Sequence, residues 1–409
     1  MKPREFVRRY RYDDRLITGA YFSEDPLQLE PGDRVGVVLL NLGGPETTAD
    51  VEPFLYNLFM DPAIIDLPVG GVFRHLLARF ISRTRARKVA RDYEAIGGGS
   101  PINLLTRQQA RSLENMLQKQ WGRDDVSFRV YIAMRYWHPT SEEAAQQMEA
   151  EGITKVILLP LYPQYSKTTT GSSLLYWWML QEAGEIPRWP TAFVYEYATH
   201  PKYVRAIGER IDEALQRFPA DKRDQVHLLF SAHGTPLREL VERKDPYCCL
   251  VHATVEHVMR LRGYDHPYHV AFQSKVGPAE WLTPSTPDKL KELAERGVTA
   301  VTVVPVAFVS DHIETSFELD IEVREEAHAL GIRDYEVTTG LNCHPLFIEA
   351  LAEVTRARFV LPGEEHTPVQ ETKAAEKRTL RCHQCLHVAE ARDWITEERL
   401  VTRSEEGGS

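Results

Sequence analysis

The sequence predicts an α/β protein made of two similar Rossmann-like domains, each with a four-stranded parallel sheet flanked by helices. Eight apolar runs rich in β-branched residues alternate with amphipathic stretches along the 409 residues. Runs that are apolar at consecutive positions are typical of strands buried on both faces, as in a parallel sheet covered by helices. The runs of the second half also repeat those of the first in kind and in order.

The expected strands follow one another with helical segments between them. They occupy residues 35–45, 126–139, 154–166, 191–197, 227–236, 268–278, 299–312 and 334–339. Helical periodicity is found in residues 141–151, 202–217, 250–262 and 286–296. This alternation of strand and helix places the chain in the α/β class.

Three pairs of segments indicate an internal duplication. Residues 152–166 match residues 297–311 in their Gly, Thr, Val and Pro positions, and two further strand-and-turn pairs recur in register. Any buried strand with a proline turn resembles any other, but three pairs in order favour duplication. We expect an N-terminal extension (1–34), a first domain (35–200), a second domain (201–361) whose last helix can pack back on the first, and a linker and tail (362–409).

Composition argues against several classes of protein. The net charge of −10 disfavours nucleic acid as a partner, because phosphate binding requires clustered Lys and Arg. No run of 18 apolar residues is present, so we expect no membrane-spanning helix. Five cysteines, an odd and sparse set, fit a reducing compartment, and the charged start lacks the apolar region of a secretory signal. We therefore expect a cytoplasmic protein.

One candidate for chemistry is a histidine at an expected strand end, where open α/β sheets bind their ligands. His233 ends an apolar run and precedes a Gly-Thr-Pro turn. A single histidine is more often structural than catalytic, so its position at the strand end is what makes it a candidate.

A second candidate is the acidic segment FVSDHIETSFELDIE (308–322). Glu314, Glu318 and Glu322 are spaced by four, so they lie on one face of an expected α-helix capped by Ser310 or Asp311. Like charges at this spacing repel, and the helix dipole favours acidic residues only in the first turn. We favour a functional row over a solvated acidic face. Histidine and carboxylates without cysteine suit a loosely held divalent cation such as Fe²⁺.

Six motifs in order resemble those of ferrochelatases. They are NLGGPE (41–46), IGGGSPI (96–102), YPQYSKTTTGSS (162–173), SAHGTP (231–236), QSKVGPAEWL (273–282) and FVSDHIETSFELDIE (308–322). The similarity runs from about residue 35 to about residue 360. It implies two chelatase-type domains around a porphyrin cleft. It also implies insertion of Fe²⁺ into protoporphyrin IX or coproporphyrin III with release of two protons, the terminal step of haem biosynthesis.

The resemblance also implies roles for individual residues. His233 matches a histidine that takes part in metal insertion or in removal of pyrrole protons, and Glu314 matches the carboxylate that faces it across the macrocycle. Both are therefore candidate metal ligands. Glu318 and Glu322 match an acidic row that passes metal or protons. Positions that contact the porphyrin or line the cleft match Arg85, Tyr93, Ser100, Arg135, Tyr136, Trp281, Phe308 and His312.

The segment 69–88 has two interpretations. Val72, Phe73, Leu76, Leu77 and Phe80 form an apolar helical stripe with arginines beside it. The stripe is either buried against the sheet, as in an ordinary amphipathic helix, or exposed at the lip of the cleft, as in the resembled family. An exposed stripe with arginines suits peripheral contact with a membrane, and the arginines also suit porphyrin propionates.

The cysteines leave an iron–sulfur cluster open. Cys382 and Cys385 form a C-x-x-C, and some ferrochelatases hold a [2Fe–2S] cluster with cysteines near the C-terminus. Such relatives also place a cysteine directly after the PQYS motif, where this chain has Lys167. Because a cluster needs four such ligands, we favour thiols that are inert or bind metal loosely.

Three other functions compete with this assignment. A cobalt or nickel chelatase acting on a sirohydrochlorin is usually a shorter chain with paired histidines. A non-catalytic tetrapyrrole carrier needs an apolar cleft but neither His233 nor the glutamate row. A nucleotide-binding enzyme is disfavoured because no G-x-G-x-x-G follows an expected strand.

Overall fold

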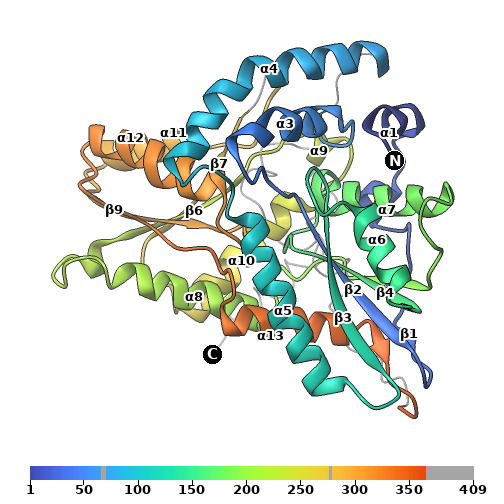
Figure 1. The fold of residues 1–409 in the computed structure, drawn as a ribbon. Helices are drawn as coiled ribbons and strands as arrows, with labels where there is room; N and C mark the ends of the chain where they lie inside the picture. Colours follow the sequence, from blue (N-terminus) through green and yellow to red (C-terminus); the bar gives the residue numbers. More distant parts are fainter. Residues whose placement is uncertain (66–70, 276–278, 365–409) are drawn as a thin grey trace. The chain divides into compact units, whose positions relative to one another are not determined.

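The computed structural model describes residues 1–65, 71–275 and 279–364. The chain forms two compact units, each with its own four-stranded sheet (Figure 1). The described residues of unit 1 are 1–65, 71–197, 309–321 and 340–364, and those of unit 2 are 198–275, 279–308 and 322–339. Unit 1 is therefore assembled from stretches of the chain that are separated by segments of unit 2.

The sheet of unit 1 is entirely parallel. Its strands are β2 (Arg34–Asn41), β3 (Ser127–Met134), β4 (Lys155–Pro160) and β5 (Thr191–Phe193). They are hydrogen-bonded in the order β3-β2-β4-β5. In β2 every residue after Arg34 is buried, because the strand lies in the middle of the sheet with helices on its faces. This explains why its sequence is apolar at consecutive positions.

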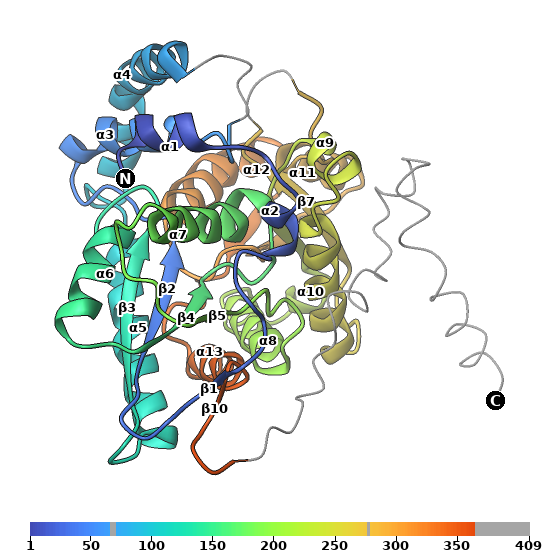
Figure 2. The ribbon, with the colours of Figure 1, turned by 90° about the vertical axis from the view of Figure 1, so that its right-hand side faces the viewer.

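Helices of unit 1 surround this sheet. They are α1 (Pro3–Arg9), α2 (Arg15–Thr18), η1 (Thr48–Asp50), α3 (Val51–Met60), α4 (Gly71–Ala95), α5 (Ile102–Trp121), α6 (Ser141–Ala150), η2 (Lys167–Gly171), α7 (Ser172–Glu182) and α13 (Pro345–Arg356). Helices α1, α3 and α4 lie side by side (Figures 1 and 2), and α13 packs against α5. The short strands β1 (Leu27–Gln28) and β10 (Phe359–Val360) form a separate parallel pair.

Unit 2 repeats the same topology. Its strands are β6 (His227–His233), β7 (Tyr268–Gln273), β8 (Ala300–Pro305) and β9 (Asp334–Val337), in the parallel order β7-β6-β8-β9. Its helices are α8 (Pro201–Leu215), η3 (Arg223–Gln225), α9 (Leu237–Val241), α10 (Tyr247–Leu261), α11 (Thr286–Glu295) and α12 (Val323–Ala329). The remaining helical element, η4 (Glu314–Glu322), leads into α12.

The two sheets confirm the predicted fold class. In each, the first strand in sequence lies between the second and the third, so the order of connection reverses beside it. Ligands of open α/β sheets bind at the carboxyl ends of the strands at such a reversal. Each third strand is also followed by a π-helix, η2 after β4 and η4 after β8. These shared features support the duplication.

The π-helix η4 contradicts one expectation from the sequence. Residues 314–322 were expected to continue an α-helix capped by Ser310 or Asp311, but their backbone hydrogen bonds close over one additional residue. The chain enters this helix at His312, whose carbonyl oxygen accepts the N–H of Ser316 at 2.9 Å. Neither expected cap is used as one, because both side chains bond to other segments.

The two units differ from the expected continuous ranges. The first unit changes to the second after Tyr197, close to the expected boundary at residue 200. The expected range 201–361 is divided between the units, and α13 belongs to unit 1. Residues 1–34 also lie in unit 1 rather than forming a separate body. Within the described residues, no helix is long and apolar enough to cross a membrane.

Candidate active site

In unit 2, His233 is the last residue of the central strand β6. Its Nδ1 lies 2.6 Å from the carbonyl oxygen of Gly234, to which it donates its hydrogen. The tautomer is therefore assigned by this contact, and the Nε2 lone pair is left for a proton or a metal. The histidine thus ends the strand beside which the connection order reverses, as the sequence predicted.

Trp281 lies at the same end of this sheet. A Cβ added at Gly234 would be 3.1 Å from Cε3 of Trp281 and 3.0 Å from the carbonyl oxygen of Gln273, so the turn after His233 admits only a small residue. Pro236 forms a β-bridge with Trp281, which fixes the indole beside this turn. Phe308, also in unit 2, follows β8 and is half-buried. Unit 2 therefore contributes an imidazole and large apolar groups at its strand ends.

In unit 1, His312 and Glu314 form a charged pair before and at the start of η4. His312 is buried, its Nδ1 contacts the carbonyl oxygen of Ser310 at 3.1 Å, and its Nε2 lies 3.8 Å from Glu314 Oε1. Burial lowers the pKa of His312, but the nearby carboxylate of Glu314 outweighs burial and raises it. The pair therefore favours a protonated imidazole beside an ionised carboxylate.

The acidic row becomes more exposed along η4. Glu314 and Glu318 are half-buried and Glu322 is exposed. Tyr93 in α4 is buried close to the first two, since burial and then the charge of Glu314 raise the pKa of its hydroxyl, with a smaller contribution from Glu318. A hydrogen bond with Ser100 opposes this rise. Unit 1 thus brings together Tyr93, Ser100 and the inner part of the glutamate row.

Two glycine-rich loops hold Ser100 in place. A Cβ added at Gly99 would be 2.2 Å from the carbonyl oxygen of Glu46, and one added at Gly44 would be 2.5 Å from Cβ of Ser100. The N–H of Ser100 donates to the carbonyl oxygen of Pro45 at 2.8 Å. The GGPE and GGGSP motifs therefore need glycine because their backbones pack directly on each other. Arg85, two to three turns before Tyr93 in α4, is exposed.

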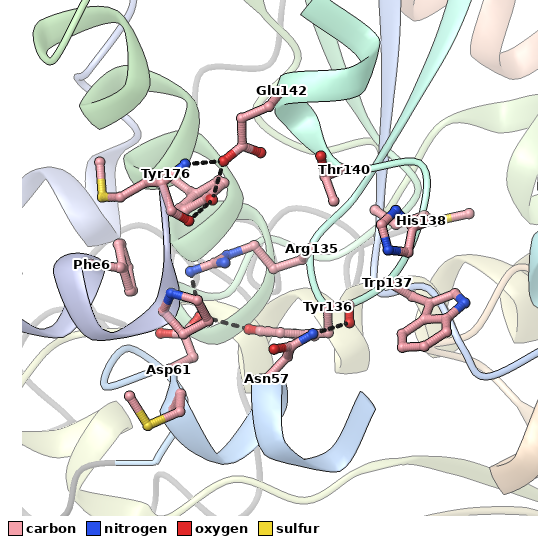
Figure 3. A pocket seen from close by; sticks show the side chains of 14 residues that line it. Phe6, Asn57, Asp61, Arg135, Tyr136, Trp137, His138, Thr140, Glu142 and Tyr176 are labelled. Atoms are coloured by element: carbon pink, nitrogen blue, oxygen red, sulfur yellow. Dashed lines mark hydrogen bonds and ion pairs between the residues drawn. The ribbon is translucent and has the colours of Figure 1, made fainter. Parts of the chain in front are cut away.

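Arg135 and Tyr136 form a second cluster in unit 1, where β3 ends (Figure 3). The Arg135 guanidinium forms an ion pair with Asp61 at 2.7 Å and donates from Nε to Ser172 at 3.1 Å. The Asp61 carboxylate also accepts hydrogen bonds from the hydroxyls of Tyr136 at 2.7 Å and Ser172 at 2.8 Å. Burial, followed by the charge of Asp61, raises the pKa of Tyr136, so its hydroxyl remains a donor.

A cavity of about 170 Å³ adjoins this second cluster. Arg135 and Asp61 lie on its wall, and the rings of Phe6 and Tyr176 lie 4.7 and 4.2 Å from the guanidinium (Figure 3). The cavity is smaller than ordinary ligand pockets, which span about 300–1,000 Å³. Asp61 was missed in the sequence, where a single aspartate after an apolar helix carries no signal of its own.

The apolar stripe of α4 faces outwards. Val72, Phe73, Leu76 and Phe80 are 57–74% exposed, while Leu77 is half-buried. Arg74 is instead buried, and its guanidinium donates to the carbonyl oxygens of Phe59 at 3.2 Å and Ile65 at 2.7 Å. The alternative in which this stripe packs on the sheet is therefore wrong for these four side chains. Residues 69 and 70 lie outside the described part of the chain.

The cysteines give no ligand set in the described structure. Cys382 and Cys385 lie outside the described residues. Lys167, at the position where cluster-bearing relatives place a cysteine, is completely buried in the first turn of η2. Across residues 1–65, 71–275 and 279–364, no three His, Cys, Asp or Glu side chains form a group that could hold a metal ion.

Comparisons with known proteins identify close relatives of the chain. The family model described as ferrochelatase matches residues 34–359. A ferrochelatase from Gloeobacter violaceus is 46% identical over 78% of this chain and 96% of its own length. One from Trichodesmium erythraeum is 41% identical over 83% of this chain and 86% of its own. Among solved structures, SirB from Bacillus subtilis with Fe³⁺ covers 80% of this chain and 95% of its own, at 11% identity and a TM-score of 0.46.

Proposed function

Because the chain belongs to the ferrochelatase family, we propose that its reaction, insertion of ferrous iron into a porphyrin, uses His233 and Glu314. In this reaction four Fe–N bonds form, two pyrrole N–H bonds break and two protons leave, with no change in the oxidation state of iron. Two functions are therefore required of the protein: a base for the protons and a group that handles the cation.

His233 is suited to be the base. Its Nδ1 hydrogen is held by the carbonyl oxygen of Gly234, so the neutral ring presents the Nε2 lone pair. A neutral imidazole with a free ring nitrogen can act as a general base. This orientation at the strand end is the observation that carries the proposal.

The glutamate row is suited to handle cations. Glu314 and Glu318 are half-buried and Glu322 is exposed, so carboxylates continue along η4 towards solvent. Oxygen ligands bind Fe²⁺ loosely and also accept protons. We assign Glu314 to the incoming metal and the outer carboxylates to its delivery. Tyr93, Ser100, Trp281, Phe308 and His312 then contact the macrocycle, while Arg85 suits a propionate because its guanidinium is exposed.

The test separates porphyrin binding from metal insertion. His233→Ala should abolish Fe²⁺ insertion under anaerobic conditions, while fluorescence titration shows that porphyrin still binds. Glu314→Gln should raise the Fe²⁺ concentration needed for half-maximal rate. His227→Gln is the matched control, because His227 begins the same strand at its opposite end and should leave the rate unchanged. Near-normal turnover of His233→Ala would contradict this mechanism.

The exposed stripe of α4 supports contact with a lipid surface and with it the use of the more apolar protoporphyrin. Phe73 and Phe80 are 70% and 66% exposed, and Arg79, Arg83 and Arg87 are exposed on the same helix. An apolar stripe beside cations is typical of helices that lie in the membrane interface. The wild-type protein should float with anionic vesicles and the variant Phe73→Glu/Phe80→Glu should not.

The control for vesicle binding is Leu261→Glu, which removes a comparably exposed apolar side chain from unit 2. Flotation that is equal for all three proteins would exclude α4 as the contact. Side-by-side assays with protoporphyrin IX and coproporphyrin III should show the higher kcat/KM with protoporphyrin.

We also propose that the protein works in the cytoplasm without an iron–sulfur cluster. At the position where cluster-bearing relatives have a cysteine ligand, this chain has the buried Lys167. An ammonium group cannot replace a thiolate as a ligand. Cys248, Cys249 and Cys343 form no disulfide within the described residues, which is compatible with a reducing compartment. Protein purified anaerobically should show no visible absorption from a cluster. A band that disappears in Cys382→Ser would contradict this.

A further inference from the structure

The loop that precedes η4 is held by two segments distant in sequence. Gln109 of α5 is completely buried, and its Nε2 donates to Ser310 Oγ and to the carbonyl oxygen of Asn342, both at 2.9 Å. The N–H of Asn342 donates to the carbonyl oxygen of Val309 at 2.8 Å. All of these residues belong to unit 1. The loop is therefore fastened immediately before His312.

Asp311 and Asn342 bond to each other in both directions. The N–H of Asp311 donates to Asn342 Oδ1 at 3.0 Å, and Asn342 Nδ2 donates to Asp311 Oδ2 at 2.7 Å. Asp311 Oδ1 accepts the N–H of Gly340 at 2.9 Å. Gly340 is required there, since an added Cβ would lie 2.9 Å from the Asp311 nitrogen. Asn342 has a φ of +49°, a conformation that asparagine and aspartate tolerate better than most residues.

These contacts occupy the Asp311 carboxylate. Both oxygens already accept a strong donor, and Oδ1 has a further, weak contact with Thr315 Oγ1 at 3.4 Å. Recruiting this group as a metal ligand or proton acceptor would compete with the bonds that hold the loop.

We infer that Asp311, Asn342 and Gln109 are positioning residues that fix His312 and Glu314 for metal insertion, and that Asp311 takes no chemical part in it. This rests on the proposed function of Glu314. We call the contacts among Asp311, Asn342 and Gln109 the clasp. A displacement of about 1 Å can reduce a rate by about 100-fold, so loss of the clasp should lower kcat. The KM for porphyrin should change less than kcat, because Asp311, Asn342 and Gln109 are not among the residues assigned to the macrocycle.

An exchange of the two side chains tests this directly. Asn342→Asp sets two carboxylates against each other, and Asp311→Asn sets two amides against each other. In Asp311→Asn/Asn342→Asp every hydrogen bond has a donor and an acceptor again. Each single variant should lower kcat by about 10- to 100-fold, with KM for porphyrin within about twofold, and the exchanged double variant should recover most of the loss. Thermal melting monitors folding in each case.

Two outcomes would overturn the inference, and a third would overturn the part that concerns Gln109. Single variants that fold and turn over normally would show that the clasp is unnecessary. A folded double variant as slow as Asp311→Asn would show that the charge at position 311 acts chemically. Normal kcat in Gln109→Leu would remove that residue from the set. Lys244→Gly, at an exposed position with φ of +61°, controls for loss of a side chain from this backbone conformation. Failure of wild-type insertion would instead refute the proposed function.

Discussion

The substitution Asp61→Asn tests the second cluster of unit 1. Asp61 is 2% exposed and neutralises the buried Arg135 at 2.7 Å. Asparagine keeps the size of the side chain and some of its hydrogen bonds, but it leaves the guanidinium without a counter-charge. Removal of one partner from a buried ion pair costs about 3–5 kcal/mol. We expect a loss near the lower limit, about 3 kcal/mol, because the amide oxygen can still accept the Tyr136 hydroxyl.

Thermal melting followed by circular dichroism measures this effect. A loss of about 3 kcal/mol corresponds to a fall in Tm of roughly 6–12 °C for a unit of this size. The control is Glu46→Gln, which breaks the 3.0 Å ion pair between Glu46 and Arg107. The side chains of Glu46 and Arg107 are 49% and 47% exposed. Such surface pairs contribute at most about 1 kcal/mol, so this control should melt within about 4 °C of wild type.

A double variant isolates the charge. Asp61→Asn/Arg135→Met removes both members of the pair, and apolar replacement of a buried pair is often neutral or stabilising. It should therefore melt at a higher temperature than Asp61→Asn alone. A Tm for Asp61→Asn within about 1 °C of wild type would refute the reasoning, because it would mean that the guanidinium is not desolvated as the structure shows.

A fall in pH and two glycine substitutions should each change the stability of the protein in a defined direction. Burial, and then neighbouring His227, lower the pKa of His269 to about 4 from its ordinary 6.5, so its stabilising contribution is complete above about pH 6.5 and is lost as the pH falls towards 4. With a discount for partial exposure, urea unfolding should show a loss of about 1 kcal/mol between pH 7 and pH 5 that His269→Gln reduces; an unreduced loss would contradict this. Gly99→Ala should destabilise strongly, since the new Cβ would meet backbone at 2.2 Å, whereas Gly208→Ala within α8 has only a 3.9 Å neighbour and should stabilise by about 0.5–1 kcal/mol. Melting temperatures that move in the same direction for both glycine variants would count against the packing argument.

The strands were predictable because burial on both faces leaves a local mark in the sequence. Every expected strand overlaps an observed one, and β2 shows why, since it is buried along nearly its whole length. The position of His233 at a strand end was visible for the same reason. The equal order of strands in both sheets could be anticipated only as a duplication, because pairing is a property of segments far apart.

Features set by distant contacts were not predictable. The π-helix over 314–322 has the same residue types as an α-helix, so its sequence gave no sign of the wider hydrogen bonding. Gln109 is separated from its partners Ser310 and Asn342 by 201 and 233 positions, and no spacing rule connects them. Arg74 illustrates the opposite difficulty. Its charge suggested the surface, yet two backbone carbonyls satisfy it in the interior.

The division of unit 1 into separate stretches has a consequence for the newly made chain. All four strands of its sheet have been synthesised by residue 193, but α13, which packs against α5, follows only after residue 344. The ribosome must therefore make the whole of β6, β7, β8 and β9 while the flank of α5 is uncovered. Incomplete intermediates with exposed apolar surface are prone to aggregate. We therefore expect the growing polypeptide to be most prone to aggregation during this interval.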